Sequence, residues 1–204
     1  MHLETINAPT KRVLEKIAKS GIAKDFYLAG GTALAIQLGH RMSEDLDWFS
    51  PDKFSGDDIK KGLSRIGSLE LIGEETGTVH GILDGVRVSF FYYGYPWLYP
   101  LVDFENIKLA DERDIAAMKI DAASSRGSKK DFIDLYFLME KYPLAELLHF
   151  FEKRYKKIKF NKLHILKSLT FFEDAQQDPM PIMIKPADWD EVKKKIAAAA
   201  NKTV

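Results

Sequence analysis

The chain has 204 residues, 46% of them hydrophobic, and its thirty basic and thirty acidic side chains give no formal net charge. This length supports one sizeable core, and a neutral surface argues against general binding of polyanions. The lack of cysteine excludes disulfides and thiolate metal sites, and no apolar run matches a membrane span or a secretory signal. We therefore expect a cytoplasmic protein.

The first third of the chain alternates between helical and strand patterns. Apolar positions recur either at the helical spacing or in short buried runs, and glycine, serine and proline separate them. The pattern predicts, in order, a helix over residues 8–20, a strand over 26–29, a helix over 32–38, a strand over 46–49 and a helix over 55–66.

A strand-rich stretch follows. Asp84-Gly85 lies between two apolar runs, which is a strong hairpin signal. The predicted strands cover residues 69–72, 79–83, 86–91 and 102–107, and an aromatic loop over 92–99 precedes the last of them.

Beyond residue 110 the pattern is helical. One helix is expected over residues 111–125, ended by Gly127, and another over 128–141; two or three more follow around a polar loop at 176–186. We therefore predict an α+β fold with a mixed sheet flanked by helices. An α/β lobe would cover residues 1–110, and a helical lobe residues 111–204.

The most informative stretch joins two glycines to two carboxylates. Gly30 and Gly31 end the first strand, so the backbone can turn tightly and approach a ligand, and the next helix offers free N–H groups to phosphate. Asp45 and Asp47 stand two apart on a strand and project to the same side. Such a pair repels itself unless a cation lies between, and Mg²⁺ with substrate phosphates suits it. The stretch therefore suggests handling of a nucleoside triphosphate.

This combination resembles the polymerase β-like nucleotidyltransferase superfamily. In detail, Leu28-Ala-Gly-Gly-Thr through Ser43-Glu-Asp-Leu-Asp-Trp-Phe is similar to nucleotidyltransferase toxins of the AbiEii/AbiGii type. A second motif strengthens the resemblance: Lys119, then Arg126, then Lys130-Asp131-Phe-Ile-Asp134-Leu. The resemblance covers residues 26 to 140, and the tail less distinctly.

The second motif also has interpretations that need no catalysis. Lys119 and Arg126 lie seven residues apart, so both face one side of a helix, and Asp131 and Asp134 share a face of the next. Asp131 could instead be the acid of a capping box that begins at Ser128. Asp134 could be a buried partner of Lys130 or Arg126, and Lys119 a solvated or aspartate-paired lysine.

The resemblance implies a mechanism and partners. Mg²⁺ would be held by Asp45 and Asp47, Lys119 would stabilise the transferring group, and Asp131, with Asp134 in reserve, would act on the acceptor hydroxyl. The triphosphate would lie against Gly30, Gly31, Thr32, Arg41 and Ser43. The acceptor would be RNA, plausibly a transfer-RNA 3′ end, and a separately encoded protein antitoxin would restrain the enzyme.

One position departs from the superfamily pattern. Ser89 stands where a third carboxylate is usual, which puts a three-carboxylate, two-metal site in doubt. Two alternatives to an RNA-modifying toxin therefore stay open. The acceptor could be a protein or small-molecule hydroxyl, or the chain could be a catalytically idle triphosphate-binding module.

Two further features of the sequence have competing interpretations. Residues 153–167 carry seven basic side chains and no acidic one, which fits either a solvated helix or a local contact with RNA phosphates. The aromatic residues of 90–99 favour packing over base stacking. His80, His149 and His164 lack the spacing of metal ligands and are expected to be structural, and His40 is expected at a helix end.

Overall fold

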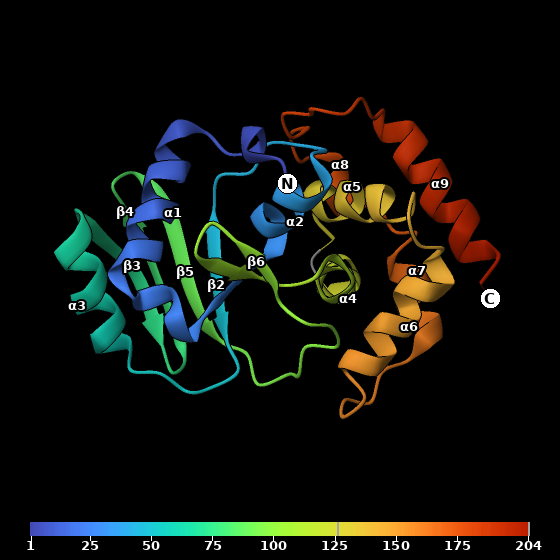
Figure 1. Cartoon of the computed structure of the whole chain (residues 1–204). Coiled ribbons are helices and arrows are strands. Elements are labelled where there is room, and N and C mark those ends of the chain that lie inside the picture. The colour runs from blue at the N-terminus through green and yellow to red at the C-terminus, as the bar shows by residue number, and fades with distance from the viewer. Residues whose placement is uncertain (126, 204) are drawn as a thin grey trace.

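The computed structural model describes residues 1–125 and 127–203 of the chain. A seven-stranded mixed sheet occupies the first half, and helices make up the second (Figure 1). The strands are β1 (Tyr27–Ala29), β2 (Leu46–Ser50), β3 (Leu69–Glu75), β4 (Thr78–Leu83), β5 (Val86–Tyr92), β6 (Val102–Phe104) and β7 (Ile107–Leu109). The longer helices are α1 (Ala8–Ser20), α2 (Gly30–Leu38), α3 (Gly56–Ile66), α4 (Glu112–Ser125), α5 (Lys129–Leu138), α6 (Leu144–Arg154) and α9 (Trp189–Asn201). Shorter ones are α7 (Lys162–Ser168), α8 (Glu173–Gln176) and the 3₁₀ turns η1 (Leu3–Thr5) and η2 (Ile22–Asp25). The α+β class, with helices following the sheet, is as predicted.

The strands lie in the order β3-β4-β5-β2-β1-β7-β6. β1 pairs antiparallel with β2 and parallel with β7, and β2 runs parallel to β5. The register places Ala29 beside Asp47, Asp47 beside Ser89, and Ser89 beside His80. Because paired residues of neighbouring strands project to the same face, these positions form one row across the sheet.

The predicted hairpin at Asp84-Gly85 is confirmed. It joins β4 to β5, and both turn residues have positive φ, 49° and 83°, as a turn that matches the strand twist requires. A single strand over 102–107 is wrong, because Glu105 and Asn106 also adopt positive φ, 46° and 65°. That turn splits the segment into β6 and β7, which pair antiparallel.

The end of the chain also differs from the expectation. The helix expected over 128–141 ends at Leu138, and four helices, α6 to α9, follow it instead of two or three. The polar loop before α9 returns to the first half of the chain, where Arg41 forms an isolated bridge with Met183. Main-chain N–H groups of Met42 and Ile184 donate to Ile182 and His40 at 2.8 and 3.0 Å. The loop therefore holds the segment that leads into β2.

One hydrophobic cluster runs through the sheet and the following helices. α2 lies between them: Ala33, Leu34 and Ile36 are fully buried, and α2 packs on both α4 and α5. Burial of a side chain such as Leu34 contributes about 1.5–3 kcal/mol, so α2 is firmly held. The division at residue 110 stays a prediction. Among the described residues, no helix has the length and apolar character needed to cross a bilayer.

Candidate nucleotidyl-transfer site

The two glycines form the turn from β1 into α2. Gly30 has φ +67°, and a Cβ there would lie 2.9 Å from Asp47 Oδ2. A Cβ on Gly31 would lie 2.6 Å from the Nη2 of Arg41. The positive φ therefore favours glycine at position 30, and a side chain on Gly31 would displace the Arg41 guanidinium from its place beside the turn. The N-cap residue is Ala29, whose methyl group cannot cap the helix, so the first N–H groups of α2 remain available to an anion.

The two carboxylates line one cavity beside this turn, but only Asp47 belongs to the strand, so alternation along a strand does not explain the place of Asp45. Asp47 lies in β2, and Asp45 directly precedes Leu46, the first residue of that strand. Both line one cavity of about 90 Å³ together with Gly31 and Thr32. The other residues around this cavity, called here the carboxylate cavity, are Arg41, Ser43, Lys119, Ser128, Lys130 and Asp131. The local sequence thus places the N–H groups that can bind phosphate and the acidic side chains around the same cavity.

Thr32 has a mainly structural side chain. It is buried, and its hydroxyl lies 2.5 Å from the main-chain oxygen of Asp45 and 2.8 Å from Ser43 Oγ. These contacts tie the start of α2 to the segment before β2. Thr32 and Ser43 both line the cavity, but the hydroxyl of Thr32 is engaged in these contacts, which leaves its main-chain N–H for phosphate.

The second motif reaches the same cavity from the helical half. Lys119 of α4 is buried, and its Nζ lies 2.8 Å from Asp131 Oδ1 and 2.6 Å from Asp134 Oδ2, both on α5. Ser128 Oγ donates to the other oxygen of Asp131 at 2.7 Å. The capping interpretation is therefore only half right, because Ser128 binds the Asp131 side chain and makes no side-chain cap to the backbone. Arg126, which belongs to the same motif, lies outside the described residues.

Asp134 is the centre of a buried charge cluster. It is fully buried, and Arg41 binds it through two nitrogens at 2.7 and 2.8 Å. His40 Nε2 lies 2.7 Å from its Oδ1, and since a carboxylate only accepts, this nitrogen carries the proton. The partners of Asp134 are therefore Arg41, His40 and Lys119, while Lys130 is exposed.

The cluster perturbs the acidity of its members. Burial would raise the pKa of Asp134, but the charges of Arg41 and Lys119 and the hydrogen bonds from His40 and Arg41 hold it well below its usual value. Burial would lower the pKa of Lys119, yet Asp134 and Asp131 raise it above its usual value. Burial lowers the pKa of His40 despite its bond to Asp134. Asp134 is thus an anion, Lys119 a cation and His40 neutral.

The geometry separates the roles of these predicted residues. Asp131 and Lys119 line the carboxylate cavity, whereas Asp134 lies behind them and binds Arg41. The guanidinium of Arg41 lines the cavity but is held by Asp134 and the carbonyl of Met42. The guanidinium of Arg41 therefore lies beside Gly31 in the cavity wall, and Asp134 holds both Arg41 and Lys119 in position.

The residue in place of a third carboxylate has a partner of its own. Ser89, beside Asp47 in the register, has its Oγ 3.0 Å from His80 Nδ1. The ring of His80 also packs edge-on against Phe91, with centroids 5.3 Å apart. His80 thus has the structural contacts that its sequence context favours.

A second cavity, of about 300 Å³, adjoins the first and was not predicted from the sequence. The two share Gly31, Asp47 and Lys119. Its walls also include Phe49 and Phe91, which stack at 5.0 Å. From α4 it takes Met118, Asp121, Ala122 and Ser125. Strand periodicity could have found the two phenylalanines, since Phe49 follows Asp47 by two residues and Phe91 follows Ser89 by two.

Most other aromatic residues of 90–99 pack in the core or a loop, as favoured. Phe90 is fully buried against Trp48, Tyr93 contacts Tyr155, and Arg113 lies 3.5 Å from the ring centroid of Tyr99.

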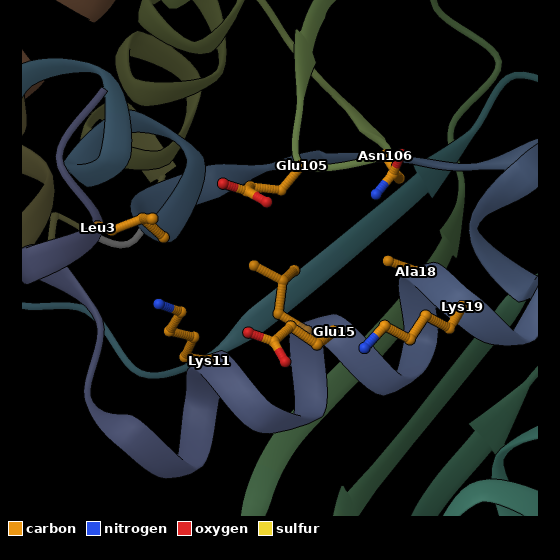
Figure 2. A pocket seen from close by; sticks show the side chains of 8 residues that line it. Leu3, Lys11, Glu15, Ala18, Lys19, Glu105 and Asn106 are labelled. Carbon is orange, nitrogen blue, oxygen red and sulfur yellow. The ribbon is translucent and has the colours of Figure 1, made fainter.

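A separate cavity of about 260 Å³ lies between α1 and the β6–β7 turn. Figure 2 shows Lys11, Glu15 and Lys19 on α1 opposite Glu105 and Asn106. Its charges are mixed, and none of the described residues predicted for the site belongs to its walls.

The chain is similar to proteins of one family. The family model "Nucleotidyl transferase AbiEii toxin, Type IV TA system" matches residues 12–109 and 98–202. An uncharacterized protein of Aquifex aeolicus (strain VF5), aq_aa25, is 42% identical over 194 residues, which cover 89% of each chain.

Solved structures share the fold at low identity. JHP933 from Helicobacter pylori is 18% identical with a TM-score of 0.59, covering 95% of this chain and 90% of its own. A nucleotidyltransferase from H. pylori, described as putative, is 19% identical with a TM-score of 0.57, covering 100% and 96%. MenT4, a nucleotidyltransferase toxin of Mycobacterium tuberculosis H37Rv, is 14% identical with a TM-score of 0.50, covering 96% and 86%.

The family match confirms the expectation of a nucleotidyltransferase that was drawn from the Gly-Gly and Asp-x-Asp motifs, and the solved structures confirm the fold. The chain belongs to the family of nucleotidyl transferase AbiEii toxins of type IV toxin-antitoxin systems.

Proposed function

We propose that this enzyme transfers a nucleoside monophosphate from a triphosphate to a hydroxyl of RNA, with Mg²⁺ held by Asp45 and Asp47. The observation that carries the proposal is the shared cavity. Asp45, Asp47, the N-terminus of α2 and Lys119 all line it, although they come from opposite halves of the chain. Phosphoryl transfer requires carboxylates that can hold a metal ion, N–H groups that bind phosphate and a cation that faces the reacting phosphorus, and one small cavity contains all three.

The donor set suits Mg²⁺. Among the described residues, no three histidine, cysteine or acidic side chains gather as a complete metal site. Two carboxylates leave most of the octahedral shell to phosphate oxygens and water, which is how Mg²⁺ is usually bound beside nucleotides. When bound, the ion would neutralise charge on the triphosphate; Asp45 and Asp47 are the residues that would hold it.

The remaining groups have separate roles around the triphosphate. Main-chain N–H groups of Gly31 and Thr32, with Ser43 Oγ, would bind the β- and γ-phosphates at the positive end of α2. Gly30 allows the backbone to approach them. Lys119 would face the transferring phosphoryl group and the departing pyrophosphate, since it lines the cavity while its ammonium is held by Asp131 and Asp134.

Asp131 is the group that would take the proton of the acceptor. The acceptor oxygen would form a bond to the α-phosphorus, the bond from that phosphorus to the bridging oxygen would break, and pyrophosphate would leave. The acceptor's proton would pass to Asp131, which Lys119 and Ser128 hold at the cavity wall. Asp134 would act through the positions of Arg41 and Lys119.

The proposed partner rests on the family, and the proposed acceptor rests on local charge. Toxins of type IV systems are paired with an antitoxin, and we propose a protein antitoxin here. RNA is proposed as the acceptor because exposed lysines of 153–167 supply local charge on a neutral chain. A protein or small-molecule acceptor and an idle triphosphate-binding module are the competing functions.

The test follows label from the α-phosphate of each triphosphate into total RNA or protein in the presence of Mg²⁺. Asp45→Asn should abolish labelling of RNA and leave the melting temperature unchanged. Asp52→Asn, at an exposed acid just beyond β2, is the matched control and should label normally. Label in protein alone would contradict the RNA acceptor, and tight triphosphate binding without any label would contradict transfer.

A further inference from the structure

A third hollow adjoins the two cavities of the transfer site. Beyond Ser125, which lines both the second cavity and the next, lies a hollow of about 310 Å³ between the end of α4 and α7. α4 and α7 pack against each other, so this hollow is a fixed part of the fold. The carboxylate cavity shares three lining residues with the second cavity, and the second cavity shares Ser125 with this hollow, so the three form one series of adjoining hollows that ends at α7. We call it the α4–α7 groove.

The outer end of the groove has the chemistry that suits a strand of nucleic acid. Lys167 and His164 of α7 line it with the ring of Phe171, and Asp174 is the one acid among its described lining residues. Phe171 is 55% exposed, and it also lines the next hollow, of about 470 Å³, beside Lys193. Lys167 and Asp174 lie on one side of this ring, and Lys193 and Glu173 on the other. An exposed ring between two hollows is a platform on which an unpaired base can stack.

The surface around this end carries local positive charge. Residues 153–172 contain no acidic side chain. Arg154 does not contribute, since it is buried and paired with Asp114. The exposed or half-buried basic side chains of the segment are Lys153, Lys156, Lys157, Lys159, Lys162 and Lys167. Of these, Lys167 lines the hollow at α7, and its charge is complementary to a phosphate backbone.

We propose that the α4–α7 groove receives the single-stranded end of a nucleic-acid acceptor. Its terminal hydroxyl would reach the carboxylate cavity, a base further from the end would stack on Phe171, and phosphates would lie near Lys167 and His164. The inference rests on the proposed transfer reaction and gives the acceptor its path. A duplex end does not fit it, because stacking on a single ring needs an unpaired base.

The test measures binding of a ten-nucleotide single-stranded RNA with a 5′ fluorophore by anisotropy. Phe171→Ala should weaken binding about 5- to 150-fold, the range expected when one base no longer stacks, whereas Phe171→Tyr should retain it. Lys167→Glu should weaken binding and flatten the slope of log affinity against log salt by about 0.7 for each phosphate that the protein no longer neutralises.

Matched controls come from the far side of the sheet. Ile72→Ala removes an apolar side chain of nearly equal exposure, 54%, and Lys61→Glu reverses an exposed charge on α3. Both should bind the RNA as the unaltered protein does. Binding of a Mg²⁺-triphosphate is measured on every variant and should not change.

Failure of this proposal is distinct from failure of the proposed function. If the unaltered protein labels RNA but Phe171→Ala binds and labels it equally well, the path is wrong and the reaction stands. Equal affinity for a blunt duplex and for the single strand would also overturn the path. If no acceptor is labelled by the unaltered protein, the transfer reaction itself is refuted, whatever the RNA affinity.

Discussion

Replacement of Asp134 by asparagine should destabilise the protein more than any other single change at the site. The variant keeps the shape of the side chain but removes its charge. Arg41 and Lys119 would then be two buried cations with Asp131 as their remaining carboxylate among the contacts of this cluster. Breaking one buried ion pair costs about 3–5 kcal/mol, because the remaining charge is left uncompensated.

The size of this loss is large beside the total stability. A folded domain is stable by only about 5–15 kcal/mol. For a chain of about this length, 1 kcal/mol lowers the melting temperature by about 2–4 °C, so Asp134→Asn should melt roughly 6–20 °C lower. Asp52→Asn, an exposed acid outside the cluster, should change the free energy of unfolding by less than about 0.5 kcal/mol.

The assay is urea unfolding at pH 7, followed by circular dichroism, for the two variants and the unaltered protein. A loss below about 1 kcal/mol in Asp134→Asn would refute the reasoning, because the cluster would then contribute no more than a surface pair. A stable variant that no longer transfers label would instead support a direct chemical role for Asp134. The family resemblance implies such a role, because it gives Asp134 as the alternative to Asp131 for action on the acceptor hydroxyl.

Three other predictions concern the turn, the basic segment and pH. Gly30→Ala should abolish transfer and cost about 1–2 kcal/mol, since φ is +67° and its Cβ would press on Asp47, a proposed Mg²⁺ ligand; normal labelling would contradict this. Arg154→Ala should cost about 3–5 kcal/mol in urea unfolding, against less than about 0.5 kcal/mol for Lys153→Ala on the same helix; equal losses would show that Arg154 is not a structural ion-pair partner. Because the pKa of His40 lies below 6.5 and that of Asp134 below 3.8 in the folded state, the unfolded chain takes up these protons first. Stability should therefore be fully present above pH 6.5 and fall as the pH drops below 6.5 and then below 3.8; urea titrations showing rising stability there would contradict the burial of both groups.

Local rules of the backbone were enough to predict the centre of the site. Glycine at two successive positions indicated a tight turn into a helix, and the close spacing of Asp45 and Asp47 indicated that both lie together. They do line one cavity, although Asp45 lies just before β2 and not in it. Both statements concern neighbours in the chain, whose relative geometry depends on few dihedral angles. The hairpin at Asp84-Gly85 was predictable for the same reason.

Pairings between distant segments were decided only by the tertiary structure. Spacing suggested Lys130 or Arg126 as partners for Asp134, but the fold brings Arg41 and His40, 93 and 94 residues away, onto its oxygens. In the same way Arg154 looked like part of a basic surface, whereas the fold buries it against Asp114. A charge run states how many cations a segment carries. Which of them are buried depends on the packing of helices far apart in sequence, because only that packing removes a side chain from water and supplies its counter-charge.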